Sequence, residues 1–348
     1  MDDTFMKIMY ADISTDGHHL IYLNNLLSEA SSGSFAVLPK HEGIVAGRCH
    51  SIARPNIRTL SGYWNWILKI KQIALKEQPD IIHLLDGDSI MRYFGFGLGQ
   101  LKAWKVVITF HHLFPGVLRK ISMRRMLRLS SVGVFHTEAI EKQVRSFGCK
   151  NVRCIPYPCF FEAIVQEKKD TSSEPPVLLA LGGTRYDKGL DIFLEALKLV
   201  DMPFRLIIAG KEEDFHRDYI EQQIQSYKDC VELNLKFLSS EEVLDYLQRS
   251  DIIVLPYRKI FDGASGPMNE GIYLGKMIIG PAHGSLGEMI RQYHVGYTFK
   301  SENVEDLAKC LQRALKMSFL YDETAKQQQK ELNPELFRIR YQELYRVL

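Results

Sequence analysis

Short apolar runs alternate with longer amphipathic stretches along the whole chain. The apolar runs are rich in Val, Ile and Phe and have the length of strands; they lie at 5–12, 34–39, 81–86, 105–110, 132–136, 152–155, 177–182, 204–210, 251–256 and 276–280. The longer stretches place apolar residues three and four positions apart, as helices do; they lie at 63–77, 137–148, 188–200, 240–250 and 304–317. This alternation is typical of parallel sheets covered by helices, so the sequence predicts an α/β protein.

The apolar pattern is interrupted near the middle of the chain. Residues 167–176, EKKDTSSEPP, are polar and end in two prolines, as interdomain linkers often do. A chain of 348 residues is long enough for two domains of about 100 to 200 residues each. The sequence therefore predicts one α/β domain on each side of the linker. A final helix is expected after Asn333 as the cap and Pro334 at its first position. One face of this helix is apolar, so it must pack on another element; that face carries Phe337, Tyr341, Leu344, Tyr345 and Leu348.

The composition excludes several classes of protein. With 46% hydrophobic residues, 25% charged residues and a mean hydropathy of −0.14, the chain is not disordered, fibrous or membrane-spanning. Its six cysteines form no C-x-x-C pair and have no histidine at zinc spacing, so we expect reduced thiols and no structural metal. The N-terminus is acidic and lacks the apolar core of a signal peptide, which favours a cytoplasmic location.

The formal net charge of +2 hides an asymmetry between the two halves. Residues 1–160 carry 20 Lys and Arg against 12 Asp and Glu, a charge of +8, whereas the remainder carries 24 against 30, a charge of −6. Part of the excess is a basic run at 118–129, which contains Arg119, Lys120, Arg124, Arg125 and Arg128. A basic surface of this kind binds nucleic acid, anionic lipid or a phosphorylated ligand.

The segment 256–280 has the pattern of an anion-binding turn. After a strand that ends at Pro256, a loop of small residues leads to Pro267, which begins a helix that carries Glu270. The loop consists of Gly263, Ala264, Ser265 and Gly266 and follows Asp262. Backbone N–H groups at such a helix start bind phosphate, and ligands of doubly wound sheets lie at the carboxyl ends of the strands. The sequence therefore predicts a phosphate site, with Glu270 placed to accept hydrogen bonds from a ribose diol.

A second strand-to-helix segment, at 178–200, carries two cations. Its strand ends in glycine, and Arg185 and Lys188 precede a helix that begins near Gly189. An arginine binds a diphosphate through paired hydrogen bonds, and a lysine binds it as a compact charge. Each segment alone also fits an ordinary turn with solvated charges. Because both occur in one half and in the same context, a shared ligand site is the better interpretation.

These segments resemble the retaining, nucleotide-sugar-dependent glycosyltransferases of family 4. In that family an arginine-bearing strand end leads to Lys-Gly-x-Asp, and two acids eight positions apart later precede Gly-Lys-Pro-Val. The matching residues here are Lys188, Gly189, Asp191, Asp262, Glu270, Gly275, Lys276 and Met277. In the first half, 106–112 is similar to the family's T-x-H strand end. The resemblance covers nearly the whole chain and is strongest at 177–290.

The resemblance implies the GT-B fold, in which two Rossmann-like doubly wound domains face each other across a cleft. Residues 1–163 would bind the acceptor, residues 164–330 would bind the nucleotide-diphosphate sugar, and residues 331–348 would form a helix that crosses back onto the first domain. The implied reaction is sugar transfer with retention of anomeric configuration. It needs neither a metal nor a cofactor, since the nucleotide-diphosphate sugar is a co-substrate.

The resemblance also assigns the site residues. In the catalytic set, His111 and Asp262 orient the donor sugar, while Arg185 and Lys188 stabilise the charge of the leaving diphosphate. The donor-binding set consists of Gly17, Gly183, Arg185, Lys188, Gly263, Ala264, Ser265, Gly266 and Glu270. The chain departs from the family at two of these positions: Gly183 replaces the usual arginine, and Asp262 replaces the usual glutamate.

Polar residues at the strand ends of the first half leave alternatives open. His112 is as good a candidate for the sugar contact as His111, and His18, His19 and His83 are weaker ones. Asp86 and Asp88 either hold the acceptor or cap the helix that follows them.

The predicted function is a glycosyltransferase that uses a UDP- or GDP-sugar in bacterial-type cell-surface polysaccharide or glycolipid assembly. The acceptor is expected to be a saccharide or a lipid-linked molecule. Because family acceptors are often lipid-linked, the basic run 119–128 predicts peripheral contact with an anionic membrane at its inner face, and nucleic acid is not expected as a partner. Two alternatives remain on the same fold: a nucleotide-sugar epimerase, and a catalytically silent scaffold subunit.

Overall fold

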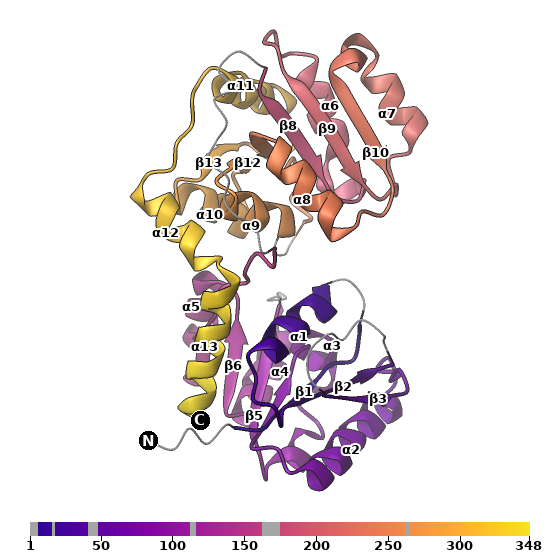
Figure 1. Cartoon of the computed structure of the whole chain (residues 1–348), viewed down its shortest axis with the longest axis vertical. Helices are drawn as coiled ribbons and strands as arrows, with labels where there is room; N and C mark the ends of the chain where they lie inside the picture. The colour runs from indigo at the N-terminus through magenta and orange to yellow at the C-terminus, as the bar shows by residue number, and fades with distance from the viewer. Residues whose placement is uncertain (1–5, 16–17, 41–47, 112–115, 162–174, 262–264) are drawn as a thin grey trace. The chain divides into compact units, whose positions relative to one another are not determined.

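The computed structural model describes residues 6–15, 18–40, 48–111, 116–161, 175–261 and 265–348 and divides into two units. The first unit comprises Met1–Phe160 together with Pro334–Leu348, and the second comprises Phe161–Asn333. The C-terminal helix α13 (Pro334–Arg346), yellow in Figure 1, therefore belongs to the first unit although the chain enters it from the second.

The described part of the first unit contains a sheet of seven parallel strands in the order β3-β2-β1-β4-β5-β6-β7. The strands are β1 (Ile8–Ala11), β2 (Phe35–Pro39), β3 (Arg48–Ile52), β4 (Ile81–Leu84), β5 (Lys105–Phe110), β6 (Val132–Phe135) and β7 (Val152–Cys154). The helices besides α13 are α1 (His18–Ser28), α2 (Leu60–Glu77), α3 (Gly87–Ile90), η1 (Met91–Tyr93), η2 (Leu98–Leu101), α4 (Val117–Arg128) and α5 (Glu138–Ser146). Figure 1 labels the helices α1–α5 and α13 and the strands β1, β2, β3, β5 and β6 of this unit.

Both faces of this sheet are buried. In β1, Met9 and Ala11 belong to a core shared with α2, α4 and α5, whereas Ile8 and Tyr10 belong to a core shared with α1 and α13. Because successive side chains of a strand point to opposite faces, a strand covered on both sides must be apolar throughout. This explains why the strands of the sheet centre are continuous apolar runs in the sequence.

The α13 helix is held to the sheet by a buried polar network. Tyr341 Oη lies 2.5 Å from Tyr22 Oη of α1 and 3.1 Å from Thr109 Oγ1 of β5. His83 of β4 bridges Thr109 and Tyr345, at 2.8 Å and 2.7 Å. Burial lowers the pKa of His83 to about 3, so its imidazole is neutral at pH 7. His83 is therefore a structural residue, and the predicted docking of the final helix is confirmed.

The described part of the second unit contains a sheet of six parallel strands in the order β10-β9-β8-β11-β12-β13. The strands are β8 (Val177–Leu181), β9 (Arg205–Gly210), β10 (Val231–Leu235), β11 (Ile252–Val254), β12 (Met277–Pro281) and β13 (Gly296–Phe299). The helices are η3 (Tyr186–Lys188), α6 (Leu190–Leu197), α7 (Arg217–Gln223), η4 (Gln225–Cys230), α8 (Ser240–Arg249), α9 (Gly266–Tyr273), α10 (Gly284–Gln292), α11 (Val304–Leu315) and α12 (Glu323–Glu331). Cores with α6, α7 and α11 on one face and α8, α9, α10 and α12 on the other cover this sheet.

Each sheet has the strand order of a doubly wound fold, in which the order of successive strands across the sheet changes direction at one point. The reversal lies between β1 and β4 in the first unit and between β8 and β11 in the second. Loops leave the carboxyl ends of such a strand pair in opposite directions, which opens a crevice for ligands. The predicted α/β class with two doubly wound domains is confirmed, and each unit has one such crevice position.

Three strands were missed by the sequence pattern, and all three lie at sheet edges. They are β3 (RCHSI), β10 (VELNL) and β13 (GYTF). An edge strand is less completely covered than a central one, so it tolerates polar residues and lacks the continuous apolar run. All six cysteines lie among the described residues, and none of them forms a disulfide.

Candidate functional site

Lys188 stands at the carboxyl end of β8, beside the crevice position of the second unit. Gly189 follows it with φ 63°, and a Cβ at Gly189 would lie 2.2 Å from the carbonyl oxygen of Pro256, after β11. A Cβ at Gly182 would lie 2.3 Å from Lys188 Nζ. Gly189 brings the chain close to β11, whereas Gly182, with φ 114°, has a backbone conformation that favours glycine and leaves room for the ammonium group. The Lys-Gly pair thus aims a cation at the point where β8 and β11 diverge.

The surroundings of Lys188 combine burial with charges of both signs. Burial lowers the pKa of its ammonium group and Arg185 adds to this, whereas the carboxylates of Asp187, Glu213 and Glu270 oppose the shift. Lys188 Nζ also lies 5.8 Å from the centre of the Tyr257 ring. A partly desolvated cation at a strand end is suited to bind an anionic ligand.

The start of α9 supplies the second part of this site. Ser265 caps the helix, since its Oγ accepts a hydrogen bond from Met268 N at 3.3 Å, and Tyr257 Oη lies 3.2 Å from the same Oγ. Pro267 occupies the first turn, as the sequence predicts, and Gly266 begins the helix. The N-terminal N–H groups of α9 therefore lie next to Tyr257 and Ser265. Three residues predicted for this loop, Asp262, Gly263 and Ala264, lie outside the described residues.

Glu270 lies one turn into α9 and interacts with Lys188. Burial raises the pKa of the Glu270 carboxyl to about 7, and the positive charge of Lys188 opposes this shift. A Cβ at Gly266 would lie 3.5 Å from Glu270 Oε1, so the carboxylate folds back toward the helix start. The structure thus brings together Lys188, Ser265, Gly266 and Glu270 of the predicted donor-binding set.

The side chain of Arg185 is more exposed than expected for a residue that clamps a phosphate. Its side chain is 48% exposed and donates two hydrogen bonds to Asp187, Nε to Oδ1 at 2.9 Å and Nη2 to Oδ2 at 2.6 Å. Gly183 leaves room for the carboxylate of Glu213, because a Cβ at Gly183 would lie 2.0 Å from Glu213 Oε2. Glu213 was not predicted from the sequence, since it stands in a polar loop after β9 with several other acids.

Arg258 explains the aspartate of the Lys-Gly-x-Asp motif. Its Nη2 donates to Asp191 Oδ2 at 2.5 Å, its Nε donates to the carbonyl oxygen of Tyr186 at 2.9 Å, and its guanidinium group lies 4.0 Å from the centre of the Tyr186 ring. The side chain of Arg258 is only 11% exposed. Asp191 therefore acts through Arg258 to fix η3, which carries Lys188, to the chain after β11. No pattern in the sequence indicates this pairing across 67 positions.

Asp12, His19 and Asp86 lie at the crevice position of the first unit. Asp12 follows β1, and its Oδ2 lies 3.0 Å from His19 Nδ1 of α1, while its Oδ1 accepts from Ile13 N at 2.7 Å. Asp86 follows β4 and caps α3 through Ser89 N at 3.0 Å. The ligand atoms of Asp12, His19 and Asp86 lie within 4.8 Å of one another. Burial raises the pKa of Asp12, and His19 opposes that shift. Two carboxylates and an imidazole can accept hydrogen bonds from hydroxyls or bind a divalent cation.

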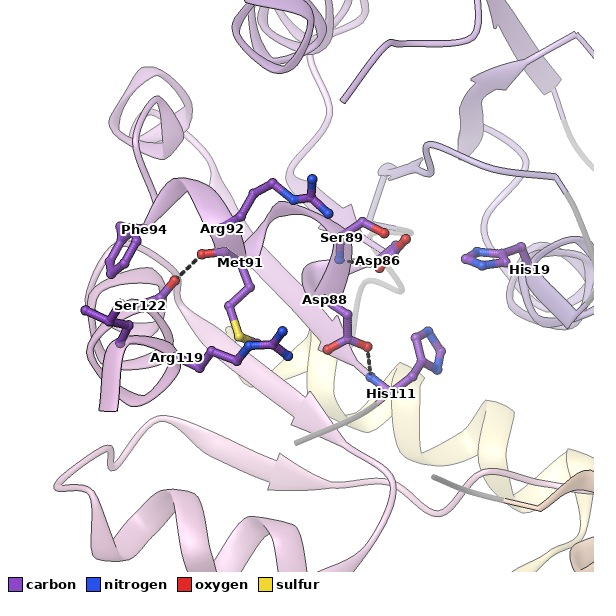
Figure 2. Close-up of a pocket in the computed structure, with 11 residues that line it drawn as sticks. His19, Asp86, Asp88, Ser89, Met91, Arg92, Phe94, His111, Arg119 and Ser122 are labelled. Carbon is purple, nitrogen blue, oxygen red and sulfur yellow. Dashed lines mark hydrogen bonds between the residues drawn. The ribbon is translucent and has the colours of Figure 1, made fainter. Parts of the chain in front are cut away.

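A cavity of about 540 Å³ opens beside this group. Figure 2 shows its lining residues, which are His19, Asp86, Asp88, Ser89, Met91, Arg92, Phe94, His111, Leu118, Arg119 and Ser122. The cavity thus contains the predicted residue His111 and both aspartates considered for the acceptor. Gly17 and His112 lie outside the described residues.

His111 is held at the end of β5 by two contacts. Its backbone N donates to Asp88 Oδ2 at 2.8 Å, and its Nε2 donates to the carbonyl oxygen of Leu85 at 3.0 Å. Because Nε2 carries the proton, Nδ1 of the neutral ring is an acceptor. Asp86 thus serves as a helix cap and as a lining residue at once, so the two alternatives for it are compatible.

Comparison with protein families identifies both halves of the chain. The model described as Glycosyltransferase Family 4 matches residues 17–158, and the model described as Glycosyl transferases group 1 matches residues 162–331. An uncharacterized glycosyltransferase of Methanocaldococcus jannaschii, MJ1178, is 29% identical over 129 residues. That match covers 37% of this chain and 35% of the relative, so the chain spans about a third of that relative's length.

Solved structures with the same fold cover nearly the whole chain. Anabaena HepE in complex with UDP has a TM-score of 0.73 at 14% identity, over 99% of this chain and 100% of the other. A glycosyltransferase from Rickettsia africae has a TM-score of 0.75 at 16% identity, over 98% of both chains. The lipopolysaccharide outer core galactosyltransferase WaaB has a TM-score of 0.72 at 12% identity, over 99% of this chain and 100% of the other. These similarities establish the GT-B fold.

Proposed function

Since this chain belongs to the retaining glycosyltransferases of family 4, we propose that it moves a sugar from a UDP- or GDP-sugar to a saccharide or lipid-linked acceptor. The observation that carries the donor half of this proposal is the partly buried cation Lys188 at the β8–β11 crevice, next to Glu270 and the start of α9. Anabaena HepE is described in complex with UDP, with UDP and glucose, and with UDP-glucose, which makes UDP the first nucleotide to test.

In the proposed reaction the bond between the anomeric carbon and the diphosphate oxygen breaks while the acceptor hydroxyl oxygen bonds to that carbon from the same face, and the hydroxyl proton passes to the released diphosphate oxygen. Lys188 and the N–H groups at the start of α9 stabilise the negative charge that develops on the diphosphate. Arg185 joins them when it exchanges Asp187 for phosphate. Glu270 accepts hydrogen bonds from the ribose diol, and Gly183 and Gly17 remain proposed donor-binding positions.

The acceptor site in this proposal is the cavity of the first unit. Asp86, Asp88 and His19 supply acceptors for sugar hydroxyls, and Phe94 and Met91 supply an apolar wall. His111, at the edge of the cavity, orients the reacting sugar together with Asp262. The positions of Asp86, Asp88 and His111, shortly after the carboxyl ends of β4 and β5, support this assignment.

We further propose that α4 contacts an anionic membrane. The helix exposes three apolar residues, Val117, Leu118 and Ile121, next to the basic residues of 119–128. Apolar residues can enter the headgroup region while basic residues bind anionic lipids. No helix in the described part of the chain has both the length and the apolar composition to cross a bilayer. The proposed location is therefore peripheral, at the inner face of a membrane where polysaccharide or glycolipid is assembled.

The donor proposal is tested by a thermal-shift panel of UDP, GDP, ADP and their sugar conjugates with the full chain. A ligand that binds only the native state raises its stability in a concentration-dependent manner. One nucleotide should stabilise the wild type, and Lys188→Ala should weaken that effect. Incubation with the matching nucleotide sugar alone should release free sugar slowly. Formation of a new nucleotide sugar would instead identify an epimerase, and no stabilisation by any nucleotide would contradict the proposal.

A further inference from the structure

The cavity of the first unit carries two arginines, although a neutral saccharide needs none. Arg92 belongs to η1, directly after α3, and Arg119 belongs to the first turn of α4. Figure 2 shows both side chains extending toward the part of the cavity where Ser89, Asp86 and Asp88 lie. The two guanidinium groups thus approach the candidate acceptor-binding carboxylates from two different elements.

The elements that carry these arginines are joined by a buried hydrogen bond. The hydroxyl of Ser122, which is 1% exposed, donates to the carbonyl oxygen of Met91 (Figure 2). Ser122 lies one turn after Arg119, and Met91 directly precedes Arg92. This contact fixes α4 against η1, so the two side chains project into the cavity from a common rigid base.

Arg92 does not serve to neutralise the neighbouring acids. Among the described residues, Arg92 forms no ion pair and donates no side-chain hydrogen bond, although it lines the same cavity as Asp86 and Asp88. Asp86 accepts a hydrogen bond from the backbone N–H of Ser89, and Asp88 accepts one from the backbone N–H of His111. The Arg92 guanidinium therefore keeps its donors available in the cavity. Planar, multidentate donors of this kind match phosphate oxygens.

We propose that the acceptor is a phosphorylated saccharide whose phosphate is bound by Arg92 and Arg119. This inference rests on the proposed acceptor function of the cavity and adds the chemical class of the ligand. Asp86 and Asp88 would hold the hydroxyls of its sugar, while the guanidinium groups would hold the phosphate on the opposite side. The phosphate belongs either to a free sugar phosphate or to a lipid-linked sugar diphosphate, and the experiment separates these sources.

The test measures binding to the full chain saturated with its preferred nucleoside diphosphate, so that the donor site is occupied. The probes are methyl α-glucoside, glucose 1-phosphate and glucose linked through diphosphate to a farnesyl chain. Glucose 1-phosphate should bind at least tenfold more tightly than the neutral glucoside, and Arg92→Gln and Arg119→Gln should each reduce its affinity by about tenfold. Arg58→Gln removes an exposed arginine of the same unit that does not line the cavity, and it should leave both affinities unchanged.

The lipid source is identified by the third probe. If the farnesyl conjugate binds more tightly than glucose 1-phosphate, and Val117→Ser or Ile121→Ser removes only that gain, the acceptor is lipid-linked. If wild type, Val117→Ser and Ile121→Ser each bind the two phosphorylated probes with equal affinity, and the arginine variants still weaken binding, the phosphate belongs to a free sugar phosphate.

The proposal is overturned if the neutral glucoside binds as tightly as glucose 1-phosphate. It is also overturned if Lys188→Ala abolishes the binding of glucose 1-phosphate and Arg92→Gln does not, because the phosphate then occupies the donor site. Failure of the proposed function has a different signature, namely a wild type that binds no nucleoside diphosphate. In that case, titration of wild type and of Arg92→Gln with glucose 1-phosphate, without nucleotide, still measures the affinity of the cavity for the phosphate.

Discussion

Arg185 and Asp187, two positions apart, are joined by two parallel hydrogen bonds of 2.9 and 2.6 Å. The pair raises the pKa of Arg185 and lowers the pKa of Asp187, so both groups are charged at neutral pH. A guanidinium group engaged by an internal carboxylate must release that partner before it binds a diphosphate. The carboxylate thereby competes with the donor for the same cation.

The first prediction is that Asp187→Asn increases the affinity for the preferred nucleoside diphosphate. An exposed ion pair contributes at most about 1 kcal/mol, so the gain should be at most about fivefold. Titration calorimetry measures it. Arg185→Gln should decrease affinity, and in the double variant Asp187→Asn should add nothing. A gain from Asp187→Asn that persists without Arg185 would show that Asp187 acts on Lys188 instead.

The second prediction is that Lys188→Ala lowers kcat more than it lowers nucleotide affinity. The ammonium group faces the charge that grows on the leaving diphosphate, and one such preorganised contact is worth about 3 kcal/mol, or about a hundredfold in rate. Donor hydrolysis and nucleotide titration measure the two effects separately. Lys198→Ala removes an exposed lysine at the end of α6 and serves as the control. Hydrolysis within about threefold of wild type would remove Lys188 from the site.

The third prediction concerns Glu270 and the pH dependence of stability. The pKa of its carboxyl is about 7 in the folded chain and 4.5 in the unfolded chain. The folded state therefore binds the proton of this carboxyl more tightly than the unfolded state does. The stabilisation of the folded state by that proton is complete below pH 4.5 and is lost as the pH rises through 7. Glu270→Gln does not titrate. Relative to wild type, the variant should gain about 3 kcal/mol in unfolding free energy between pH 4.5 and pH 7.5.

The measurement must report on the second unit, because Trp64, Trp66 and Trp104 all lie in the first. Hydrogen exchange of peptides from β11 and β12 gives the opening free energy of the second unit at each pH. Glu305→Gln, at an exposed position of α11, is the matched control and should show no such gain. A difference between Glu270→Gln and wild type that stays constant with pH would contradict the burial of this carboxylate.

The sequence predicted the centre of each sheet better than its edges. Strands such as β4, β5 and β9 are buried on both faces and read as continuous apolar runs, whereas β3, β10 and β13 carry polar residues at the sheet edge. The donor-site residues Lys188 and Glu270 were predictable because both are local features of strand-to-helix turns. Local patterns survive in a single sequence, since their geometry depends on neighbouring positions.

The residues that sequence reasoning missed depend on contacts between distant segments. Arg258 reaches Asp191 across 67 positions, and Asp12 meets Asp86 only because β1 and β4 are neighbours in the sheet. Asp12 did have a local signal, since it directly follows a buried strand. Arg92 and Arg119 line the same cavity because η1 contacts α4, and no spacing in the sequence indicates that contact.

The fourth prediction is that chelation leaves the reaction unchanged. Lys188, Arg185 and the N-terminus of α9 supply the positive charge that a divalent cation would otherwise bring to the diphosphate. Donor hydrolysis in EDTA should stay within about twofold of the rate with added Mg²⁺ or Mn²⁺. If EDTA abolishes hydrolysis and a divalent cation restores it, Asp12→Asn tests whether the ion binds at Asp12, His19 and Asp86.

The fifth prediction is that α4 binds anionic vesicles through two separable contributions. Replacement of Arg124, Arg125 and Arg128 by Gln removes positive charge worth about 1 kcal/mol per residue near an anionic surface. This contribution is screened within about 10 Å at 0.1 M salt, so the loss should be largest at low salt. Val117→Ser with Ile121→Ser removes exposed apolar area, 75% and 50% of each side chain, and should weaken binding at every salt concentration. These five residues do not line the cavity, so nucleotide and acceptor binding should be retained.

Co-sedimentation with vesicles measures both effects. As a control, replacement of Lys309, Lys316 and Lys330 of the second unit by Gln removes the same amount of positive charge. A wild type that ignores anionic vesicles at low salt would contradict membrane contact and leave the basic residues of α4 to a protein partner or to the acceptor.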